Sequence, residues 1–365
     1  MYKTPGRQRF IYRSFFCESM NGPLHTLGLV LKTQGFSKIF PITYHLIRWY
    51  TAKALGKTYY KRKIFDKYML LRTSDNGISR SLALMGRREL EHHFILRRVL
   101  HPTDNVLDLG ANIGYYVLLE HSIIGDSGKI YAVEPDPNNF SQLKRNVALN
   151  KMDNVILHQA AVSDTAGKTK LFLSEFSNVH SLIAGHEHAT DRFVEVDMIN
   201  IATFLQKHPI DLIRMDIEGY ETKILASIAK NAKQLPKILF ETHPGKYGVD
   251  NNIVPIFREL AKRGYVCEFA ASANQNHAKN LKEFGLVPIK KIATDGFYRY
   301  MYKDIELATL AKVIQHTRTV LLVPKGMPAK SAVRKKTTKR VVKKSKFTTK
   351  KVSIKKSASN RRSRK

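Results

Sequence analysis

The stretch Asn105-Val-Leu-Asp-Leu-Gly-Ala-Asn-Ile-Gly114, followed later by Lys129-Ile-Tyr-Ala-Val-Glu134, decides the fold. The first stretch is typical of a short buried strand that ends at Asp108 and continues into a turn bracketed by glycines. The second is an apolar run that stops at an acid twenty residues after Gly114. In a nucleoside-binding βαβ unit, glycines let the backbone approach the ligand and the acid accepts hydrogen bonds from ribose hydroxyls. The two stretches therefore predict a nucleoside site.

The residues around the glycines separate two classes of nucleoside cofactor. A dinucleotide site uses the pattern G-x-G-x-x-G to seat a pyrophosphate on a helix N-terminus. Here Asn112 takes the place of the middle glycine, and Asp108 precedes the turn. A carboxylate repels a pyrophosphate but attracts the ammonium and sulfonium groups of S-adenosylmethionine (SAM). At this point the chain resembles SAM-dependent methyltransferases of the Rossmann-like class; an NAD-type site and a ligand-free fold are the alternatives.

The charge of the chain is concentrated at its two ends. The 365 residues carry a formal net charge of +32, and 43% of them are hydrophobic, which is enough for a substantial core. Residues 1–100 contain 19 Lys and Arg against 5 Asp and Glu, and residues 325–365 contain 18 against none. Residues 101–324 contain 25 of each sign. The middle of the chain is therefore electrically ordinary, and the ends are the candidates for contact with nucleic acid or an anionic surface.

Cysteine usage and hydropathy indicate the cellular compartment of the protein. Cys17 and Cys267 are too few for a disulfide framework, and no Cys/His spacing typical of a metal site is present. No uninterrupted apolar run reaches the ~18 residues that a transmembrane helix needs. The basic N-terminus lacks the long apolar core of a secretory signal. We expect an intracellular, soluble protein, and the basic tail makes a nuclear or nucleic-acid-associated location a further interpretation.

Three regions follow from these patterns. Residues 1–86 are basic and aromatic, and we expect an N-terminal helical cap in which residues 39–55 form a half-amphipathic helix; membrane-surface or nucleic-acid contact is the alternative. Residues 87–324 contain the globular domain. Residues 325–365 form a low-complexity tail of Lys, Arg, Ser and Thr that buries too little apolar surface to fold alone, so we expect disorder.

Strands and helices alternate from residue 105 onward, which predicts a mostly parallel sheet. Asp136 is placed to cap the helix that follows the second strand, with Pro137 at its first position. Residues 174–192 are polar and without period, and their length predicts a functional loop. The expected strands lie near 105–109, 130–133, 155–159, 211–216, 237–241, 265–269 and 297–302, with a further strand near 168–173. The expected fold class is therefore α/β: a Rossmann-like seven-stranded, mostly parallel sheet with helices on both faces.

Four blocks together resemble the FkbM family of methyltransferases. They are Asp108-Leu-Gly-Ala-Asn-Ile-Gly114, Val133-Glu-Pro-Asp-Pro137 with Asn146 and Asn150 downstream, Arg214-Met-Asp-Ile-Glu-Gly-Tyr-Glu221, and Ile238-Leu-Phe-Glu-Thr-His243. Each block alone is a weak signal, but their order and spacing from about residue 89 to 302 are specific. The resemblance implies SAM-dependent O-methylation, usually of a hydroxyl on a small molecule or glycan. The family often has Lys where Arg214 stands, which keeps the charge but not the hydrogen-bond geometry.

The SAM-binding residues follow from the same blocks. Asp108 is expected at the amino group of SAM, with helix capping as the alternative, and Glu134 at the ribose diol. The methionine end is expected to be lined by Gly110, Asn112 and Gly114. Many methyltransferases place an acid after the third strand for the adenine amino group. Here backbone groups of Ala161 and Val162, helped by Asp164, are expected to serve instead.

The catalytic side is expected at the ends of the fourth and fifth strands, since ligands of open α/β sheets bind at that edge. Asp216, Glu218, Glu241 and His243 converge there if the strand order is the usual one. Methyl transfer to a hydroxyl needs a positioned acceptor and a base that removes its proton. Helix capping is the alternative for the two residues of the Asp-x-Glu pair, and a satisfied strand-end histidine for His243. A metal held by these acids and His243 is an alternative, but the Asp-x-Glu spacing alone does not demand one, and we assign none.

The function predicted is a SAM-dependent O-methyltransferase that acts on a hydroxyl-bearing small molecule or glycan. The first alternative is methylation of RNA or DNA, with the basic tail supplying phosphate contacts. The second is a catalytically idle SAM-fold module that binds nucleic acid or an anionic surface. The run Asp216-Ile-Glu-Gly219 lacks the Pro-Pro-aromatic sequence that stacks a flipped base, which argues against base N-methylation. The loop histidines His180, His186 and His188 are expected to be exposed, with substrate contact as the alternative.

Overall fold

The computed structural model describes residues 35–175, 179–185, 189–247 and 252–326, together with Gly28 and Leu31. Every element described below belongs to one compact unit within Met1–Pro328. His186, His188, Cys17 and the expected basic tail beyond residue 326 lie outside the described residues. Among the described residues, no helix is both long and apolar enough to cross a membrane.

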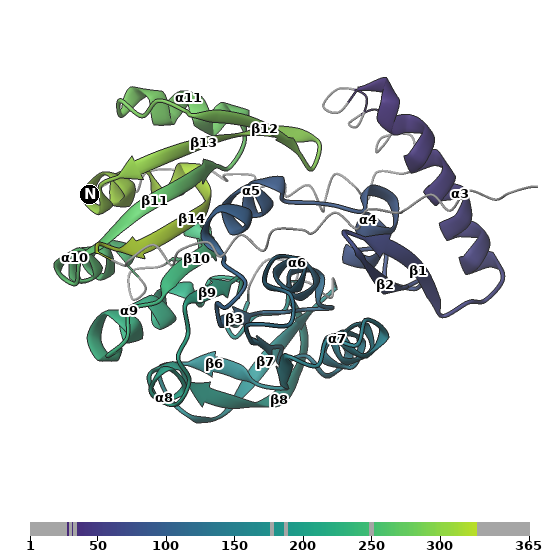
Figure 1. Ribbon diagram of the computed structural model, residues 1–365, viewed down its shortest axis with the longest axis horizontal. Coiled ribbons are helices and arrows are strands. Elements are labelled where there is room, and N and C mark those ends of the chain that lie inside the picture. Colours follow the sequence, from purple (N-terminus) through teal and green to yellow (C-terminus); the bar gives the residue numbers. More distant parts are fainter. Residues whose placement is uncertain are drawn as a thin grey trace, which may run out of the picture. The chain divides into compact units, whose positions relative to one another are not determined.

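The elements alternate along the chain as the sequence predicts, around one large sheet (Figure 1). The strands are β1 (Tyr59–Ile64), β2 (Lys67–Arg72), β3 (Val106–Leu109), β4 (Ile130–Val133), β5 (Val155–His158), β6 (Ala161–Ser163), β7 (Gly167–Ser174), β8 (Ala189–Asn200), β9 (Leu212–Met215), β10 (Lys237–Glu241), β11 (Tyr265–Ser272), β12 (Lys290–Thr294), β13 (Phe297–Ile305) and β14 (Thr317–Pro324). The helices are α3 (Ile39–Ala54), α4 (Ile78–Met85), α5 (Leu90–Val99), α6 (Tyr115–Ile124), α7 (Pro137–Leu149), α8 (Ile201–Lys207), α9 (Glu221–Asn231), α10 (Ile253–Lys262), α11 (Gln275–Glu283) and α12 (Leu307–Val313).

The strand order of the large sheet is β12-β13-β11-β14-β10-β9-β3-β4-β5. The five strands from β10 to β5 are parallel, and the strands beyond β10 pair antiparallel. Chain order reverses between β3 and β9, because β3 continues to β4 on one side while β9 and β10 extend the sheet on the other. In open α/β sheets such a reversal opens a crevice at the carboxyl ends of the strands. The predicted Rossmann-like fold class is confirmed.

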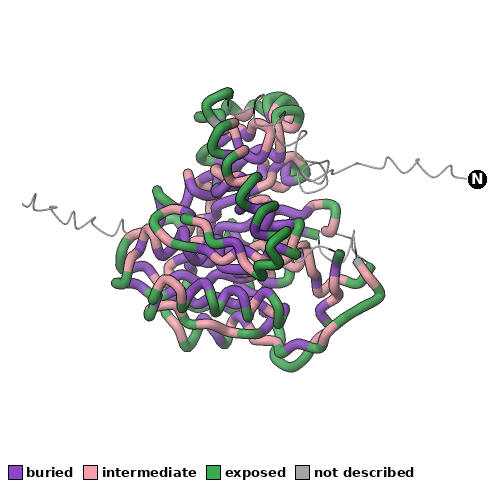
Figure 2. The backbone as a smooth tube through the Cα atoms, turned by 90° about the vertical axis from the view of Figure 1, so that its right-hand side faces the viewer, coloured by how far each residue is buried: buried purple, intermediate pink, exposed green. Residues whose placement is uncertain are grey.

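The alternation of side chains along the central strands builds two cores, one on each face of the sheet. On one face Val106, Leu212 and Leu239 pack with α5, α6 and α7. On the other face Ile213 and Phe240 pack with α8, α9, α10 and α12. Strands buried on both faces have near-continuous apolar sequences, which is why β4 is an apolar run and β3 and β9 are apolar apart from Asp108 and Arg214. Figure 2 shows the buried positions gathered in the interior of the unit and the exposed ones on the outer helix turns.

The N-terminal region attaches to this domain through side-chain amides. Here the β1–β2 hairpin accompanies the helices, which the sequence had not indicated. The backbone of β2 exchanges hydrogen bonds with α7: Leu70 N–H donates to Asn146 Oδ1, and Tyr68 N–H donates to Asn150 Oδ1, both at 2.8 Å. Asn150 Nδ2 donates back to the carbonyl of Tyr68. The two asparagines of the family-like block therefore satisfy backbone groups of β2, which would otherwise be a bare strand edge.

Several boundaries differ from the sequence expectations. The large sheet has nine strands among the described residues rather than seven, because β12 and β14 were not predicted, whereas β13 was expected near 297–302. β14 inserts between β11 and β10 at the end of the domain. The expected loop 174–192 is shorter, since β8 begins at Ala189 and pairs with β6 and β7 in a separate three-stranded sheet. The predicted cap of α7 is confirmed: the Asp136 side chain accepts from Asn139 N–H, with Pro137 in the first turn.

Candidate functional site

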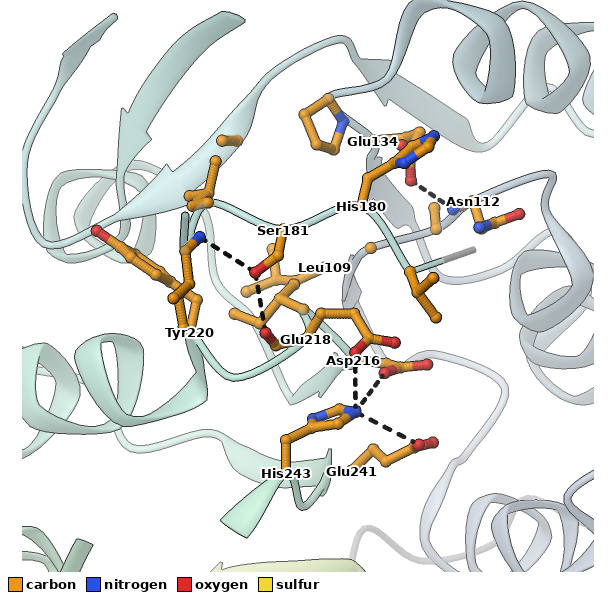
Figure 3. Close-up of a pocket in the computed structure, with 18 of the residues that line it drawn as sticks. Leu109, Asn112, Glu134, His180, Ser181, Asp216, Glu218, Tyr220, Glu241 and His243 are labelled. Atoms are coloured by element: carbon orange, nitrogen blue, oxygen red, sulfur yellow. Dashed lines mark hydrogen bonds and ion pairs between the residues drawn. The ribbon is translucent and has the colours of Figure 1, made fainter. Parts of the chain in front are cut away.

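Four neighbouring strands end at one cavity of about 680 Å³. β10, β9, β3 and β4 lie side by side in the sheet, and the residues just after or at their carboxyl ends line this space. Glu134 follows β4, Gly110 follows β3, Asp216 follows β9, and Glu241 ends β10. The volume falls within the ~300–1,000 Å³ that small-molecule sites occupy. The segment 179–185 also lines the cavity, and its Ser181 Oγ donates to the Glu218 carbonyl at 3.0 Å (Figure 3).

The two glycines after β3 meet different requirements. Gly110 has a φ of +78°, and a Cβ there would lie 2.2 Å from the backbone carbonyl oxygen of Asp216. Any side chain would therefore push apart the ends of β3 and β9, the two strands on either side of the topological reversal. Gly114 has a φ of +93°, and a Cβ there would lie 2.8 Å from Leu143 of α7. Gly114 does not line the cavity, so its predicted place at the methionine end gives way to a packing role.

Glu134 lines the cavity although its side chain is almost fully buried. Its Oε2 accepts from Asn112 N–H at 2.8 Å, and its Oε1 accepts from Asp136 N–H at 2.9 Å. Each carboxylate oxygen keeps a further lone pair, because an ionised carboxylate accepts about four hydrogen bonds. Burial raises the pKa of this carboxyl to about 8, although the two backbone donors favour its ionised form. The arrangement offers paired acceptors to a ligand with two adjacent donors.

The cavity lining also contains the residues predicted to bind adenine. Ala161 and Val162 of β6 are buried and line the cavity, as does Ala160 before them. Asp164 is exposed and outside the lining, and its Oδ1 accepts from Ser163 Oγ at 2.8 Å. Asp164 is therefore not positioned to assist in binding adenine. His180, expected to be exposed, is half-buried and lines the cavity.

Asp108 does not line the cavity, contrary to the expectation that it faces the ligand. It lies directly opposite Arg214 in the register of β3 and β9, so both side chains point to the same face of the sheet. Arg214 Nη1 lies 3.2 Å from Asp108 Oδ1, and its Nη2 lies 3.2 Å from Asp216 Oδ2. The guanidinium also stacks 3.8 Å above the ring centroid of Tyr116. Arg214 therefore ties a fully buried carboxylate to a cavity-lining one.

His243 stands among the predicted catalytic acids (Figure 3). Its Nε2 lies 3.7 Å from Asp216 Oδ1, 3.5 Å from Glu218 Oε2 and 3.6 Å from Glu241 Oε1. The structure thus brings together all four residues predicted for the catalytic side. This convergence follows from the register of β9 and β10, in which Met215 pairs with Phe240 and the next residue of each strand is an acid.

Burial and charge set the protonation of this cluster. Burial alone lowers the pKa of His243, but the carboxylates of Glu221 and Glu218 raise it to about 9. The carboxylates around the imidazole therefore stabilise a positive charge at this position. Burial raises the pKa of Asp216, against the opposing charges of Arg214 and His243.

Sequence reasoning missed the residues that support these acids. Glu221 Oε1 accepts from His243 Nδ1 at 3.0 Å, yet its position inside the helix-opening block suggested no role for it. Lys246 pairs with Glu218, and the Arg318 guanidinium contacts Glu241. Arg318 belongs to β14, a strand that was not predicted, so no local pattern pointed to it. Only the pairing of β14 with β10 brings that cation to the cluster.

Solved structures that match this chain include two TYW2 proteins and a SAM-dependent O-methyltransferase. TYW2 from M. jannaschii in complex with AdoMet has 16% identity and a TM-score of 0.36, and the match covers 68% of this chain and 87% of that one. TYW2 from P. horikoshii in complex with MeSAdo has 15% identity and a TM-score of 0.36, covering 76% and 82%. A SAM-dependent O-methyltransferase from Thermotoga maritima has 9% identity and a TM-score of 0.33, covering 64% of each chain. All three TM-scores lie below 0.5, so we draw nothing about the acceptor from them.

The family comparison concerns the sequence itself. A search of curated proteins gave no match. Residues 108–267 match the model of the methyltransferase FkbM domain, a stretch that begins at Asp108 and includes β3 to β10 and the start of β11. This confirms the resemblance seen in the four sequence blocks. Residues 108–267 form a methyltransferase domain of the FkbM family, a SAM-dependent family, and SAM is its cofactor.

Proposed function

We propose that this enzyme transfers the methyl group of SAM to a hydroxyl of a small molecule or glycan. One observation carries the proposal: a single cavity joins Glu134, a paired hydrogen-bond acceptor, to a cluster of carboxylates at the ends of β9 and β10. The first end suits a ribose diol. The second suits an acceptor that must lose a proton, which a hydroxyl does when it is methylated.

The residues present fit SAM. The free lone pairs of Glu134 match the two ribose hydroxyls, and the backbone of Ala161 and Val162 lies on the wall for adenine. Asn112, held in a left-handed conformation with φ +50°, and Gly110 lie on the side expected for the methionine moiety. Asp108 is proposed to act indirectly, by fixing Arg214 and through it Asp216. When bound, SAM supplies an electrophilic methyl group on a positively charged sulfur.

The acid cluster is proposed to position and deprotonate the acceptor. The acceptor oxygen forms the O–CH₃ bond as the S–CH₃ bond breaks, and the electron pair of that bond remains on sulfur. The hydroxyl proton passes to the carboxylates of Asp216 and Glu218, which line the cavity. Positioning of this kind supplies much of the acceleration of a two-substrate displacement. Ser181 holds the segment 179–185 against Glu218, so this segment is proposed to select the acceptor.

Methylation of nucleic acid is the competing function. It is favoured by the 18 Lys and Arg of residues 325–365, which lie almost entirely outside the described residues. The basic cluster at residues 339–346 also suggests a nuclear-import signal, which stays a prediction. The absence of a Pro-Pro-aromatic run after β9 argues against a flipped base as acceptor. A hydroxyl acceptor agrees better with the four carboxylates gathered around His243.

The direct test is label transfer from tritiated SAM. The purified enzyme is incubated with metabolite and glycan pools, and separately with cellular RNA and DNA. We expect labelled small molecules or glycans with a mass increase of about 14, since one hydrogen is replaced by a methyl group at the acceptor. Label that is lost on nuclease treatment, and absent from the metabolite and glycan pools, would reject the proposed acceptor class.

Removal of the basic tail separates the two functions further. β14 ends at Pro324, and Lys325 N–H still donates to the Gly264 carbonyl at 2.8 Å, so the truncation is placed after Gly326. We expect methyl transfer to a small acceptor to be unchanged, while the salt-dependent affinity for DNA measured by fluorescence anisotropy falls steeply. A parallel loss of both properties would favour the nucleic-acid function.

The affinity for SAM should rise with pH through about 8. The ionised Glu134 accepts hydrogen bonds from the ribose hydroxyls, whereas its buried, protonated form has less acceptor capacity, so binding lowers its pKa and releases a proton. Below pH 8 each unit then weakens binding by up to about tenfold. Calorimetry from pH 6.5 to 9 measures this slope. Glu134→Gln should bind SAM more weakly, and its affinity should not depend on pH in this range. A pH dependence equal to that of the wild type would assign the effect to another group.

A further inference from the structure

The imidazole of His243 is held rigidly from its Nδ1 side. Nδ1 lies 3.0 Å from Glu221 Oε1, and that oxygen also accepts from the backbone N–H groups of Ile217 and Gly219 at 3.2 Å. The Tyr247 hydroxyl donates to Glu221 Oε2 and accepts from the backbone N–H of His243 at 3.0 Å. The carboxylate therefore fixes the plane of the ring and its orientation. A histidine whose far nitrogen binds a metal is almost always held in this way by a carboxylate or carbonyl on its other nitrogen.

The other ring nitrogen is aimed at unused ligand atoms. Within the described part of the chain, His243 Nε2 and Asp216 Oδ1 have no hydrogen-bond partner, and neither has Glu241 Oε2. The His243 side chain is only 7% exposed and that of Glu241 only 1%. The three carboxylate oxygens nearest Nε2 lie 3.5–3.7 Å away, beyond a normal hydrogen bond. Buried polar atoms without partners are uncommon, and a bound ligand or ion is one way in which they are satisfied.

The three residues also have the geometry of a ligand set. One ligand atom each from Asp216, Glu241 and His243 can be chosen so that all lie within 4.8 Å of one another. A cation bound at about 2.1 Å places its ligand atoms about 3.0 Å apart in adjacent positions and about 4.2 Å apart in opposite ones. Small rotations of the two carboxylates bring the ligand atoms from within 4.8 Å of one another to these separations. Two carboxylates and one imidazole leave further coordination positions open toward the cavity.

We propose that Asp216, Glu241 and His243 bind a divalent cation of the kind that accepts mixed oxygen and nitrogen ligands, such as Mn²⁺, and that this cation binds the acceptor hydroxyl. The inference rests on the proposed function, because the open positions face the cavity in which the acceptor would lie. From the sequence, a metal held by these acids and His243 was only an alternative. What points to one is the partnerless Nε2 on a ring held by Glu221, which only the tertiary structure reveals.

The cation gives each acid a defined task. Coordination lowers the pKa of a bound hydroxyl, so the acceptor oxygen loses its proton more readily before it attacks the methyl carbon. Glu218, which is paired with Lys246 and outside the ligand set, accepts that proton. The O–CH₃ bond then forms as the S–CH₃ bond breaks with its electrons kept by sulfur, and the cation is unchanged. Arg318, in contact with Glu241, offsets part of the negative charge when the site is empty.

The test is Mn²⁺ binding to the full chain without any acceptor. The protein is stripped with EDTA, which is then removed, and Mn²⁺ is titrated with electron paramagnetic resonance detection of the free ion. We expect one tight site per chain. Competition with Mg²⁺, Ca²⁺ and Zn²⁺ identifies the preferred cation class. Failure of the wild-type protein to bind Mn²⁺ at millimolar concentration overturns the proposal.

Two variants and a control locate the site. Glu241→Gln removes a ligand, and Glu221→Gln removes the carboxylate behind His243; we expect the second to weaken Mn²⁺ binding by about 10–100-fold and the first by at least as much. Glu195→Gln, on the exposed β8, should leave binding unchanged. Thermal melts check that each variant is folded. Full-strength Mn²⁺ binding by a folded Glu241→Gln protein would place the ion elsewhere and contradict the ligand assignment.

SAM calorimetry on the same preparations separates this inference from the proposed function. If the protein binds SAM but not Mn²⁺, the cation proposal is rejected and the proposed methyltransferase function is not affected. If the protein binds Mn²⁺ but transfers label only to nucleic acid, the cation proposal stands and the small-molecule or glycan acceptor is rejected. Mn²⁺ binding lost in both Glu221→Gln and Glu241→Gln, with SAM affinity unchanged, is the result expected.

Discussion

Glu134→Ala is expected to weaken SAM binding by at least about 100-fold. The carboxylate is proposed to accept hydrogen bonds from two ribose hydroxyls, and hydrogen bonds to a charged group contribute about 1.5–3 kcal/mol each. Their joint loss of about 3–6 kcal/mol corresponds to two to four orders of magnitude in the dissociation constant. The alanine also leaves the backbone N–H groups of Asn112 and Asp136 without their acceptor. Isothermal calorimetry with SAM measures the effect.

Two matched variants make this result interpretable. Glu134→Gln keeps the shape and one acceptor oxygen but loses the charge, so its affinity should fall between those of the wild type and Glu134→Ala. Glu195→Ala removes a glutamate that is 63% exposed on β8 and should bind SAM normally. Unchanged SAM affinity in a folded Glu134→Ala protein would show that the ribose is held elsewhere.

Arg214→Met is expected to destabilise the domain by about 3–5 kcal/mol. The guanidinium is buried between Asp108 and Asp216, and removing one partner of a buried ion pair leaves an uncompensated charge. At about 2–4 °C for each kcal/mol in a domain of this size, the melting temperature should fall by roughly 6–20 °C. Differential scanning fluorimetry measures the shift. The exposed Arg258 supplies the control, since Arg258→Met should change the melting temperature little.

The deficit of Arg214→Met should depend on pH. Burial already raises the pKa of Asp108 and of Asp216, and without the cation their ionised forms become still less favourable. The two carboxyls are protonated at low pH, so the loss of stability should shrink as the pH falls and grow as it rises. Arg214→Lys keeps a charge but cannot reach both acids with a planar fork, so it should lie between the wild type and Arg214→Met. A deficit that is constant from pH 5 to 9 would assign the effect to lost packing on Tyr116 instead.

The central βαβ unit could be predicted from the sequence because the patterns that identify it are local. A buried strand, a glycine turn and an acid at the end of the next strand are written in consecutive residues, and the register of a parallel sheet then brings Glu134 and Gly110 to one edge. The same logic predicted that Asp216, Glu218, Glu241 and His243 would meet. Asp108 lies outside the cavity lining, because the side of the sheet to which a residue points is set by strand alternation, and this residue shares its side with Arg214.

The strands beyond the parallel core were harder to predict. β14 inserts between β10 and β11 after a long excursion through β12 and β13, and the local sequence of Thr317–Pro324 contains nothing that names its partners. The contact of Arg318 with Glu241 depends on that insertion. The hairpin of β1 and β2 was missed for a related reason, since Asn146 and Asn150 of α7 satisfy its backbone from far along the chain.

The sequence by itself determined the fold class, the methyltransferase family and the residues at the ends of the parallel strands, because each depends on patterns of neighbouring residues. Only the tertiary structure decided which of these side chains share a cavity, which lie behind it, and how the histidine ring is oriented. Those properties depend on burial and on distances between residues remote in the chain. The pairing of Glu221 with His243, which leaves one ring nitrogen facing three acids, exists only after β9 and β10 have come together.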